Sequence, residues 1–160
     1  MPVDQPGFAQ GGGPHAAMPS KADSDGGPKT AGARRGEQPS AGAPRVMILE
    51  DEFLVRCCVE DDVRASGCSI VGPFSDLADA AAATDGEEID LAILDVNVNG
   101  KMVFPLVDAL LKKGVRVLFL SGYGAADLPE QYRTIPQLAK PHDPTMLTRL
   151  IGQILKRPEG

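Results

Sequence analysis

The sequence has no long apolar run and few thiols. No stretch of its 160 residues approaches the ~20 consecutive apolar residues that a membrane span requires, and the N-terminus lacks the charged start and apolar core of a secretory signal. Its three cysteines, of which Cys57 and Cys58 are adjacent, have the spacing of neither a disulfide framework nor a zinc site. We therefore expect a cytoplasmic protein whose thiols are reduced.

Clusters of basic residues are also scarce. The formal net charge is −6, and basic residues are adjacent only at positions 34–35, 112–113 and 156–157. A nucleic-acid surface needs grouped Lys and Arg side chains to displace the counterions of the phosphate backbone. We expect no nucleic-acid partner.

Residues 1–44 differ in composition from the rest of the chain. They hold 9 of the 18 glycines and 7 of the 14 prolines, yet their only large apolar side chains are Met1, Val3, Phe8 and Met18. Such a stretch cannot bury enough apolar surface to offset the loss of chain entropy on folding. The composition predicts a disordered Gly/Pro-rich tail over residues 1–44 and one folded domain over residues 45–157.

Short apolar runs alternate with amphipathic stretches in that domain. The runs are too short for helices and predict buried strands at residues 46–49, 69–72, 91–94, 115–120 and 135–139. Helical spacing of apolar residues predicts helices at residues 53–66, 75–85, 103–113 and 143–156. Repeated strand–helix units with apolar strands indicate a parallel sheet covered on both faces by right-handed crossovers. The fold class is therefore doubly wound α/β.

Residues 121–134, "SGYGAADLPEQYRT", break this alternation. They contain two glycines and one proline and lack helical periodicity, so they predict at most a short or irregular helix. Elsewhere the expected core stripes are Val55, Cys58, Val59 and Val63 on the first helix and Leu106, Val107, Leu110 and Leu111 on the third. Ser75 is the expected cap of the second helix.

Polar residues follow the ends of four predicted strands. Glu50 and Asp51 follow the first strand, Asp95 the third, Ser121 the fourth and Lys140 the fifth. Parallel strands bring their carboxyl ends to one edge of the sheet, which is where open α/β folds bind ligands. We expect these side chains to meet at that edge.

Clustered carboxylates require a counter-charge. Two unit charges at 4 Å repel by about 4 kcal/mol under an effective dielectric constant of 20. Oxygen donors without nearby His or Cys favour Mg²⁺ over zinc. We predict that Asp51 and Asp95 are Mg²⁺ ligands, that Glu50 binds the ion directly or through water, and that the backbone carbonyl of Asn97 completes the set.

The ordered set of strand-end residues, with Lys140-Pro141 after the fifth strand, resembles the receiver domain of bacterial two-component response regulators over residues 45–157. The resemblance implies a flavodoxin-like sheet of five parallel strands in the order 2-1-3-4-5. It also implies that Asp95 accepts a phosphoryl group from a phosphohistidine of a sensor histidine kinase, with Mg²⁺ bound by the acidic pair. Ser121 would then bond a phosphoryl oxygen and Lys140 would pair with the phosphoryl charge, and the Lys140-Pro141 bond is often cis in this family.

The stretch "LFLSGYG" at residues 118–124 resembles the motif of a receiver subgroup nicknamed FAT GUY, in which the fourth helix is reduced or mobile. Members are commonly partnered with HWE-type kinases. Four departures stand out: Glu50 and Ser121 replace the commoner Asp and Thr, Gln137 stands where many receivers carry a switching aromatic residue, and His142 stands where an apolar residue is more usual. We expect His142 at the surface or at the start of the last helix.

Three functions are compatible with these residues. Because the chain ends soon after the last helix, we expect a stand-alone receiver that relays its signal by protein contact or drains phosphate from a kinase, with no enzymatic turnover beyond its own phosphorylation and dephosphorylation. One alternative is a receiver-like binding module that is never phosphorylated. The other is an Asp-nucleophile phosphohydrolase, although Asn97 stands where the haloacid dehalogenase pattern has a second Asp. Each residue alone also fits a turn, a helix cap or a solvated charge, and only their joint order favours the receiver.

Overall fold

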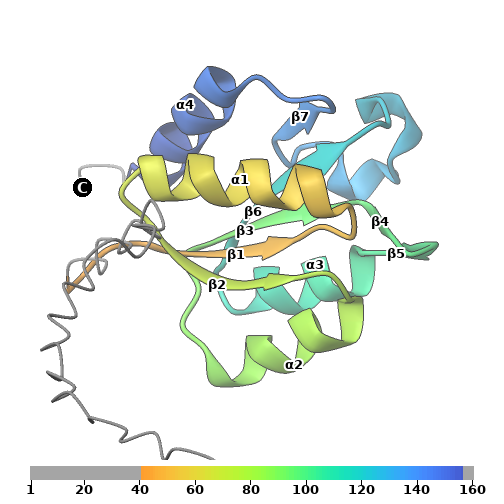
Figure 1. Cartoon of the computed structure of the whole chain (residues 1–160). Coiled ribbons are helices and arrows are strands. Elements are labelled where there is room, and N and C mark those ends of the chain that lie inside the picture. The colour runs from red at the N-terminus through yellow and green to blue at the C-terminus, as the bar shows by residue number, and fades with distance from the viewer. Residues whose placement is uncertain (1–40, 157–160) are drawn as a thin grey trace, which may run out of the picture. The chain divides into compact units, whose positions relative to one another are not determined.

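The structure, a computed structural model, describes residues 41–156. Most of the predicted tail, residues 1–40, and residue 157 of the predicted domain lie outside the described residues. Five parallel strands form the main sheet in the order β2-β1-β3-β6-β7 (Figure 1). They are β1 (Arg45–Leu49), β2 (Ser69–Phe74), β3 (Leu91–Asp95), β6 (Arg116–Ser121) and β7 (Gln137–Ala139). The expected flavodoxin-like order 2-1-3-4-5 is confirmed.

Two helices cover each face of the sheet. Helices α1 (Phe53–Ala65) and α4 (Pro144–Leu155) lie on one face, and α2 (Leu77–Gly86) and α3 (Phe104–Lys112) lie on the other (Figure 1). Alternate residues of β1 point to opposite faces, so Val46 and Ile48 pack with α1 and α4 whereas Met47 and Leu49 pack with α2 and α3. Strand β3 is buried along its whole length, as its continuous apolar run predicts.

Two apolar residues predicted in the core are exposed. Cys58 faces solvent because α1 packs through the narrower stripe of Val55, Val59 and Val63, spaced four residues apart. Leu111 is 45% exposed, since it lies about 100° around α3 from the buried Leu110. The helical periodicity of apolar residues predicted both helices correctly but assigned one exposed residue to the buried stripe of each.

The cap of α2 also differs from the prediction. Asp76, and not Ser75, is the N-cap, and its Oδ1 accepts hydrogen bonds from the backbone amides of Ala78 at 2.8 Å and Asp79 at 3.4 Å. A carboxylate at this position satisfies two amides and interacts favourably with the positive end of the helix dipole.

Residues 121–134 contain no α-helix, as predicted. They form two short 3₁₀ turns, Ala125–Asp127 and Glu130–Tyr132. The second half of the segment is fixed to the core: Leu128 and Tyr132 are buried, the Tyr132 ring stacks on Phe104 at 4.6 Å between centroids, and Tyr132 Oη donates to Asp108 Oδ1 at 2.9 Å. No residue from 122 to 127 is buried.

Leu128 should therefore account for much of the stability of this segment. Replacing a buried Leu by Ala typically costs about 2–5 kcal/mol, so we expect Leu128→Ala to lower the free energy of unfolding by an amount in that range. Leu111→Ala, on an exposed residue, is the matched control and should change it by about 0.5 kcal/mol or less. The chain has no tryptophan, so urea denaturation followed by far-UV circular dichroism is the suitable measurement. Equal effects of the two substitutions would contradict the assignment of Leu128 as an anchor.

Candidate functional site

Three carboxylates meet at the carboxyl edge of the sheet. Glu50 and Asp51 follow β1, and Asp95 ends the adjacent β3, whose residue Leu94 pairs with Leu49. One carboxylate oxygen from each of the three acids lies within 4.8 Å of the other two. Glu50 is 1% exposed and Asp95 is 7% exposed, so solvent screens their charges poorly.

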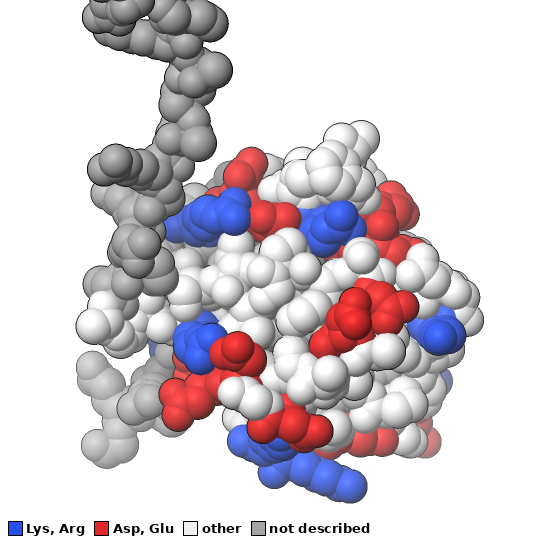
Figure 2. Space-filling view, turned by 60° about the horizontal axis from the view of Figure 1, so that its bottom comes forward, with Lys and Arg blue, Asp and Glu red and all other residues white. Residues whose placement is uncertain are grey.

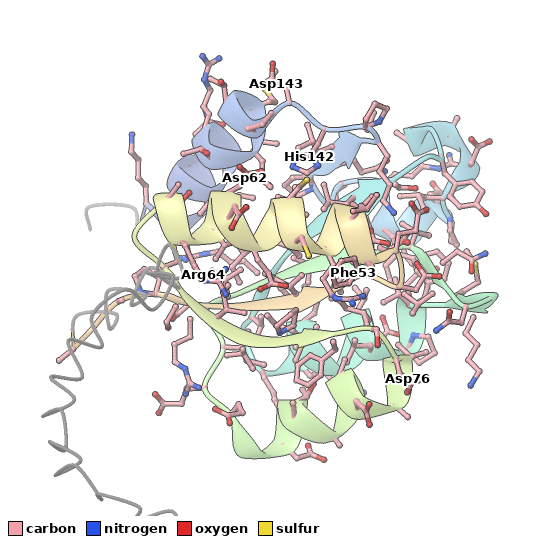
Figure 3. All side chains as sticks on the ribbon, viewed as in Figure 1. Phe53, Asp62, Arg64, Asp76, His142 and Asp143 are labelled. Atoms are coloured by element: carbon pink, nitrogen blue, oxygen red, sulfur yellow. The ribbon has the colours of Figure 1, made fainter. Side chains whose placement is uncertain are left out.

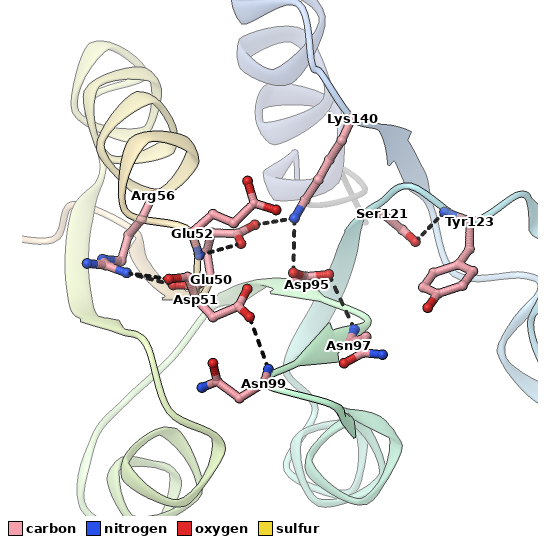
Figure 4. Close-up of polar contacts among 10 residues, drawn as sticks. All are labelled: Glu50, Asp51, Glu52, Arg56, Asp95, Asn97, Asn99, Ser121, Tyr123 and Lys140. Atoms are coloured by element: carbon pink, nitrogen blue, oxygen red, sulfur yellow. Dashed lines mark hydrogen bonds and ion pairs between the residues drawn. The ribbon is translucent and has the colours of Figure 1, made fainter.

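Lys140 reaches into this cluster from the end of β7 (Figure 4). Its Nζ donates to Asp95 Oδ2 at 2.9 Å and lies 2.6 Å from Glu50 Oε2. Burial by itself favours the neutral amine, but the contacts with Glu50 and Asp95 outweigh it and raise the pKa of Lys140 above its usual value. Lys140 is therefore a cation at neutral pH, and its charge opposes that of the carboxylates.

Glu50 is the most strongly perturbed acid of the cluster. Burial is the main cause that raises its pKa to about 7; the charge of Asp95 acts in the same direction, and the Lys140 and Glu52 contacts only partly oppose them. Its Oε1 accepts a hydrogen bond from the backbone amide of Glu52 at 3.0 Å, whereas Oε2 is buried without an aligned hydrogen-bond donor. A buried carboxylate oxygen with spare lone pairs suits a cation. Together with the two other carboxylates, it makes the site fit a divalent ion with oxygen ligands.

Asp51 is held by a hairpin that the sequence prediction missed. Strands β4 (Asn97–Val98) and β5 (Lys101–Met102) pair antiparallel, and the turn residues Asn99 and Gly100 have φ angles of 52° and 81°. The backbone amide of Asn99 donates to Asp51 Oδ2 at 3.0 Å. Burial opposes ionisation of Asp51, but the hydrogen bond from Asn99 and further hydrogen bonds outweigh it and lower its pKa. An Asn-Gly pair between short strands is a known hairpin signal and could have been used.

Asn97 and Ser121 lie beside the cluster in different arrangements. The backbone amide of Asn97 donates to Asp95 Oδ1 at 3.3 Å. The expected role of its backbone carbonyl as a metal ligand stays a prediction. Ser121 is 1% exposed, and its Oγ accepts a hydrogen bond from the Tyr123 amide at 2.9 Å. Figure 4 shows the hydroxyl turned toward Tyr123 and away from Asp95. The structure thus groups Glu50, Asp51, Asp95 and Lys140 closely and leaves Ser121 at their margin.

Comparison with known proteins gives two kinds of finding. No protein-family model matches the chain. The transcriptional regulatory protein PdtaR of Mycobacterium tuberculosis is 28% identical over 111 residues, which are 69% of this chain and 54% of PdtaR. The chain therefore spans about half the length of the curated relatives that it matches.

Among solved structures, SdrG from Sphingomonas melonis Fr1 is 27% identical with a TM-score of 0.64, and the match covers 72% of this chain and 99% of SdrG. The receiver domain of the PhyR response regulator from Erythrobacter litoralis is also 27% identical with a TM-score of 0.64, over 74% and 97% of the two chains. The described domain has the fold of response regulator receiver domains and is similar to them in sequence. The expected fold of this region is confirmed.

An arginine that the sequence reasoning missed holds the acidic loop of the described domain. Arg56 Nη1 donates to the backbone carbonyl of Glu50 at 2.9 Å and lies 3.5 Å from that of Asp51. Its guanidinium also lies 5.5 Å from the centre of the Phe53 ring. A basic residue in the first turn after an acidic pair was the available signal, and its contacts tie the backbone of the acidic pair to α1.

The side chain of His142 is largely buried. Its side chain is 5% exposed, and Nε2 lies 2.8 Å from Asp62 Oδ2 on α1. His142 directly precedes Asp143, the N-cap of α4, so it lies at the start of the last helix, which is one of the two expected positions. Its side chain is not at the surface, because a carboxylate on the facing helix supplies a polar contact that offsets the cost of burying the imidazole. The Lys140–Pro141 peptide bond just before it is cis, in agreement with the family resemblance.

Basic side chains of the described domain are dispersed. Figure 2 shows Lys and Arg interspersed with Asp and Glu over the face that carries α2 and α3, with no continuous basic patch among the described residues of that face. Several are paired: Lys113 lies 3.1 Å from Asp85, and Arg45 contacts Glu87. Among residues 41–156, no helix has the length and apolar character needed to cross a bilayer.

Glu50 should make the stability of the metal-free domain depend on pH. The pKa of the Glu50 carboxyl group is about 7 in the folded protein, whereas its ordinary value is 4.5. Between these two pH values, the group therefore binds more protons in the folded protein than in the unfolded one. Its favourable contribution is therefore complete below about pH 4.5 and is lost as the pH rises toward 7. Relative to Glu50→Gln, the wild-type free energy of unfolding should fall by about 1–3 kcal/mol over this range. Urea denaturation in EDTA at several pH values measures it, and a pH-independent difference between the two proteins would contradict the assignment.

Proposed function

We propose that this receiver domain accepts a phosphoryl group on Asp95 from a sensor histidine kinase in a Mg²⁺-dependent reaction. The observation that carries the proposal is the placement of Asp95. It is nearly buried at the end of a rigid strand, 2.9 Å from the Lys140 ammonium and within reach of two further carboxylates. Receiver domains in general are phosphoacceptors rather than enzymes with turnover, and this site matches that role.

In the reaction, a carboxylate oxygen of Asp95 attacks the phosphorus of the phosphohistidine. A phosphorus–oxygen bond forms, the phosphorus–nitrogen bond breaks, and the imidazole leaves with the bonding electron pair. Glu50, Asp51, Asp95 and the Asn97 carbonyl would hold Mg²⁺, which supplies charge neutralisation for the incoming phosphoryl oxygens. Phosphoryl transfer depends mainly on positioning and electrostatic stabilisation, and this chain provides both through fixed side chains.

Lys140 and Ser121 act on the phosphorylated form. The phosphoryl group adds a charge of about −1.5 to −2, with which the Lys140 ammonium pairs. The Ser121 oxygen accepts the Tyr123 amide, and its own hydrogen is free to be donated to a phosphoryl oxygen, because a hydroxyl is both donor and acceptor. Since Ser121 begins the segment 121–134, its movement transmits phosphorylation to the surface.

The output is then a change in protein contact or the removal of phosphate from a kinase. A tenfold change in affinity for a partner needs only about 1.4 kcal/mol of conformational bias.

The reduced helical structure of residues 121–134 fits the FAT GUY subgroup, so an HWE-type kinase is our proposed donor. In support of a phosphoacceptor role, a second SdrG structure, over which the aligned identity is 28%, shows the BeF₃-activated conformation of that protein.

Phosphotransfer from candidate kinases tests the proposal directly. Wild-type protein should gain the mass of one phosphoryl group, and Asp95→Asn should gain none, because the amide is a poor nucleophile. Intact mass spectrometry is the readout. Modification of the Asn variant at the wild-type level would refute Asp95 as the acceptor.

Two alternatives give different outcomes in related experiments. A receiver-like module that is never phosphorylated would show the same NMR spectrum and the same partner binding after treatment with acetyl phosphate or with beryllofluoride and Mg²⁺. A phosphohydrolase would instead release phosphate from a phosphomonoester over many turnovers.

Lys140→Ala should separate metal binding from the response to phosphorylation. Removing the ammonium leaves the three carboxylates in place, so we expect Mg²⁺ affinity, measured by calorimetry, to be retained or increased. The spectral change induced by beryllofluoride should weaken, since the phosphoryl mimic loses its cationic partner. Lys113→Ala, which removes a lysine paired with Asp85 on another surface, is the control. Equal beryllofluoride responses of wild type and Lys140→Ala would count against this role of Lys140.

A further inference from the structure

A largely buried contact between the side chains of His142 and Asp62 joins the loop that follows Lys140 to the helix that follows the acidic pair. Nε2 of His142 lies 2.8 Å from Asp62 Oδ2, and the two side chains are 5% and 13% exposed. Figure 3 shows His142, in the loop that precedes α4, facing Asp62 on α1. The residues are 80 positions apart in the sequence, so this contact is entirely a product of the tertiary structure.

His142 belongs to the four-residue loop 140–143, which joins β7 to α4 and carries Lys140 at its first position. The two ends of this loop are fixed by different contacts. The Lys140 amide donates to the Ser121 carbonyl at 3.0 Å, and Asp143 caps α4 by accepting from the Thr145 amide at 2.7 Å. Through its imidazole, the loop is also tied to α1.

Helix α1 begins two residues after Asp51, so the same helix that follows the acidic pair holds the lysine loop. The Lys140 side chain is long and has several rotatable bonds, so ordering it against Asp95 and Glu50 costs conformational entropy. This cost is lower when the Lys140 backbone is held at one distance from both acids. A tie between loop 140–143 and α1 sets that distance. An apolar side chain at position 142 would fill the same space but would not fix a direction, since a hydrogen bond is directional and a hydrophobic contact is not.

We propose that His142 and Asp62 are positioning residues that hold Lys140 in register with Asp95, an inference that rests on the proposed function. They act through Lys140 and contact neither the acids nor the phosphoryl group. A pair that only stabilised the fold would affect every property of the site alike. A positioning pair affects the response that depends on Lys140 and leaves Mg²⁺ binding unchanged.

A double-mutant cycle with Lys140→Ala tests this. In the protein that retains Lys140, His142→Ala and Asp62→Ala should each weaken beryllofluoride binding, measured by calorimetry with Mg²⁺ present, by about tenfold. In the Lys140→Ala background the same changes should have less than about a twofold effect, because the group that they position is gone. Within each background, these two changes should alter Mg²⁺ affinity without beryllofluoride by less than about twofold.

Two further substitutions at position 142 separate the hydrogen bond from packing. His142→Gln retains an N–H donor toward Asp62 and should restore most of the affinity, whereas His142→Phe fills the space without the donor and should not. These two variants carry the comparison if His142→Ala fails to fold. Asp61→Ala is the matched control for Asp62→Ala, because Asp61 is the neighbouring residue on α1 and its side chain is 82% exposed.

The outcomes are distinct. Equal losses with and without the Lys140→Ala substitution, or wild-type affinity in His142→Phe, would overturn the positioning role while leaving phosphorylation of Asp95 intact. Wild-type protein that neither binds beryllofluoride nor accepts a phosphoryl group would overturn the proposed function itself, and the positioning role with it.

Discussion

The structure of the site depends on a charge imbalance in a nearly buried corner of the sheet. Three carboxylates and one ammonium leave two negative charges when all four groups are ionised, and a divalent cation matches that excess. The raised pKa of Glu50 is the physical sign of the imbalance, because burial and the charge of Asp95 make its ionisation costly without a further cation. Glu50 and Asp51 both accept a backbone amide hydrogen bond, but only the more exposed Asp51 has a lowered pKa, because burial outweighs the hydrogen bonds at Glu50.

The surrounding fold serves to keep these charges in place. Strand β3 is buried on both faces and carries Asp95 at its end, so this side chain has a rigid base. The β4–β5 hairpin, Arg56 and the loop of Lys140 then approach the cluster from three sides through directed hydrogen bonds. A rigid base for Asp95 and directed hydrogen bonds around it suit the phosphoacceptor role proposed above.

Much of this arrangement could be predicted from the sequence because it follows from local rules. Apolar runs of four to six residues identified the strands, and parallel pairing then brought strand-end residues together at one edge. What could not be predicted was non-local or depended on single residues. The orientation of Cys58 is set by how α1 rotates on the sheet, and the burial of His142 depends on a carboxylate 80 positions away. The β4–β5 hairpin was a different kind of miss, since its Asn-Gly signal was present.

The segment that replaces a fourth crossover helix has a consequence for molecular recognition. Between the buried Ser121 and the buried Leu128, the chain exposes two glycines, two alanines, Tyr123 and Asp127. A protein that contacts this stretch meets main-chain amides, methyl groups and one aromatic ring instead of the regular ridges of a helix. Recognition of such a surface depends more on the conformation of its backbone than on its side chains. A small displacement of Ser121 would therefore alter the shape that a partner contacts, while the exposed residues stay the same.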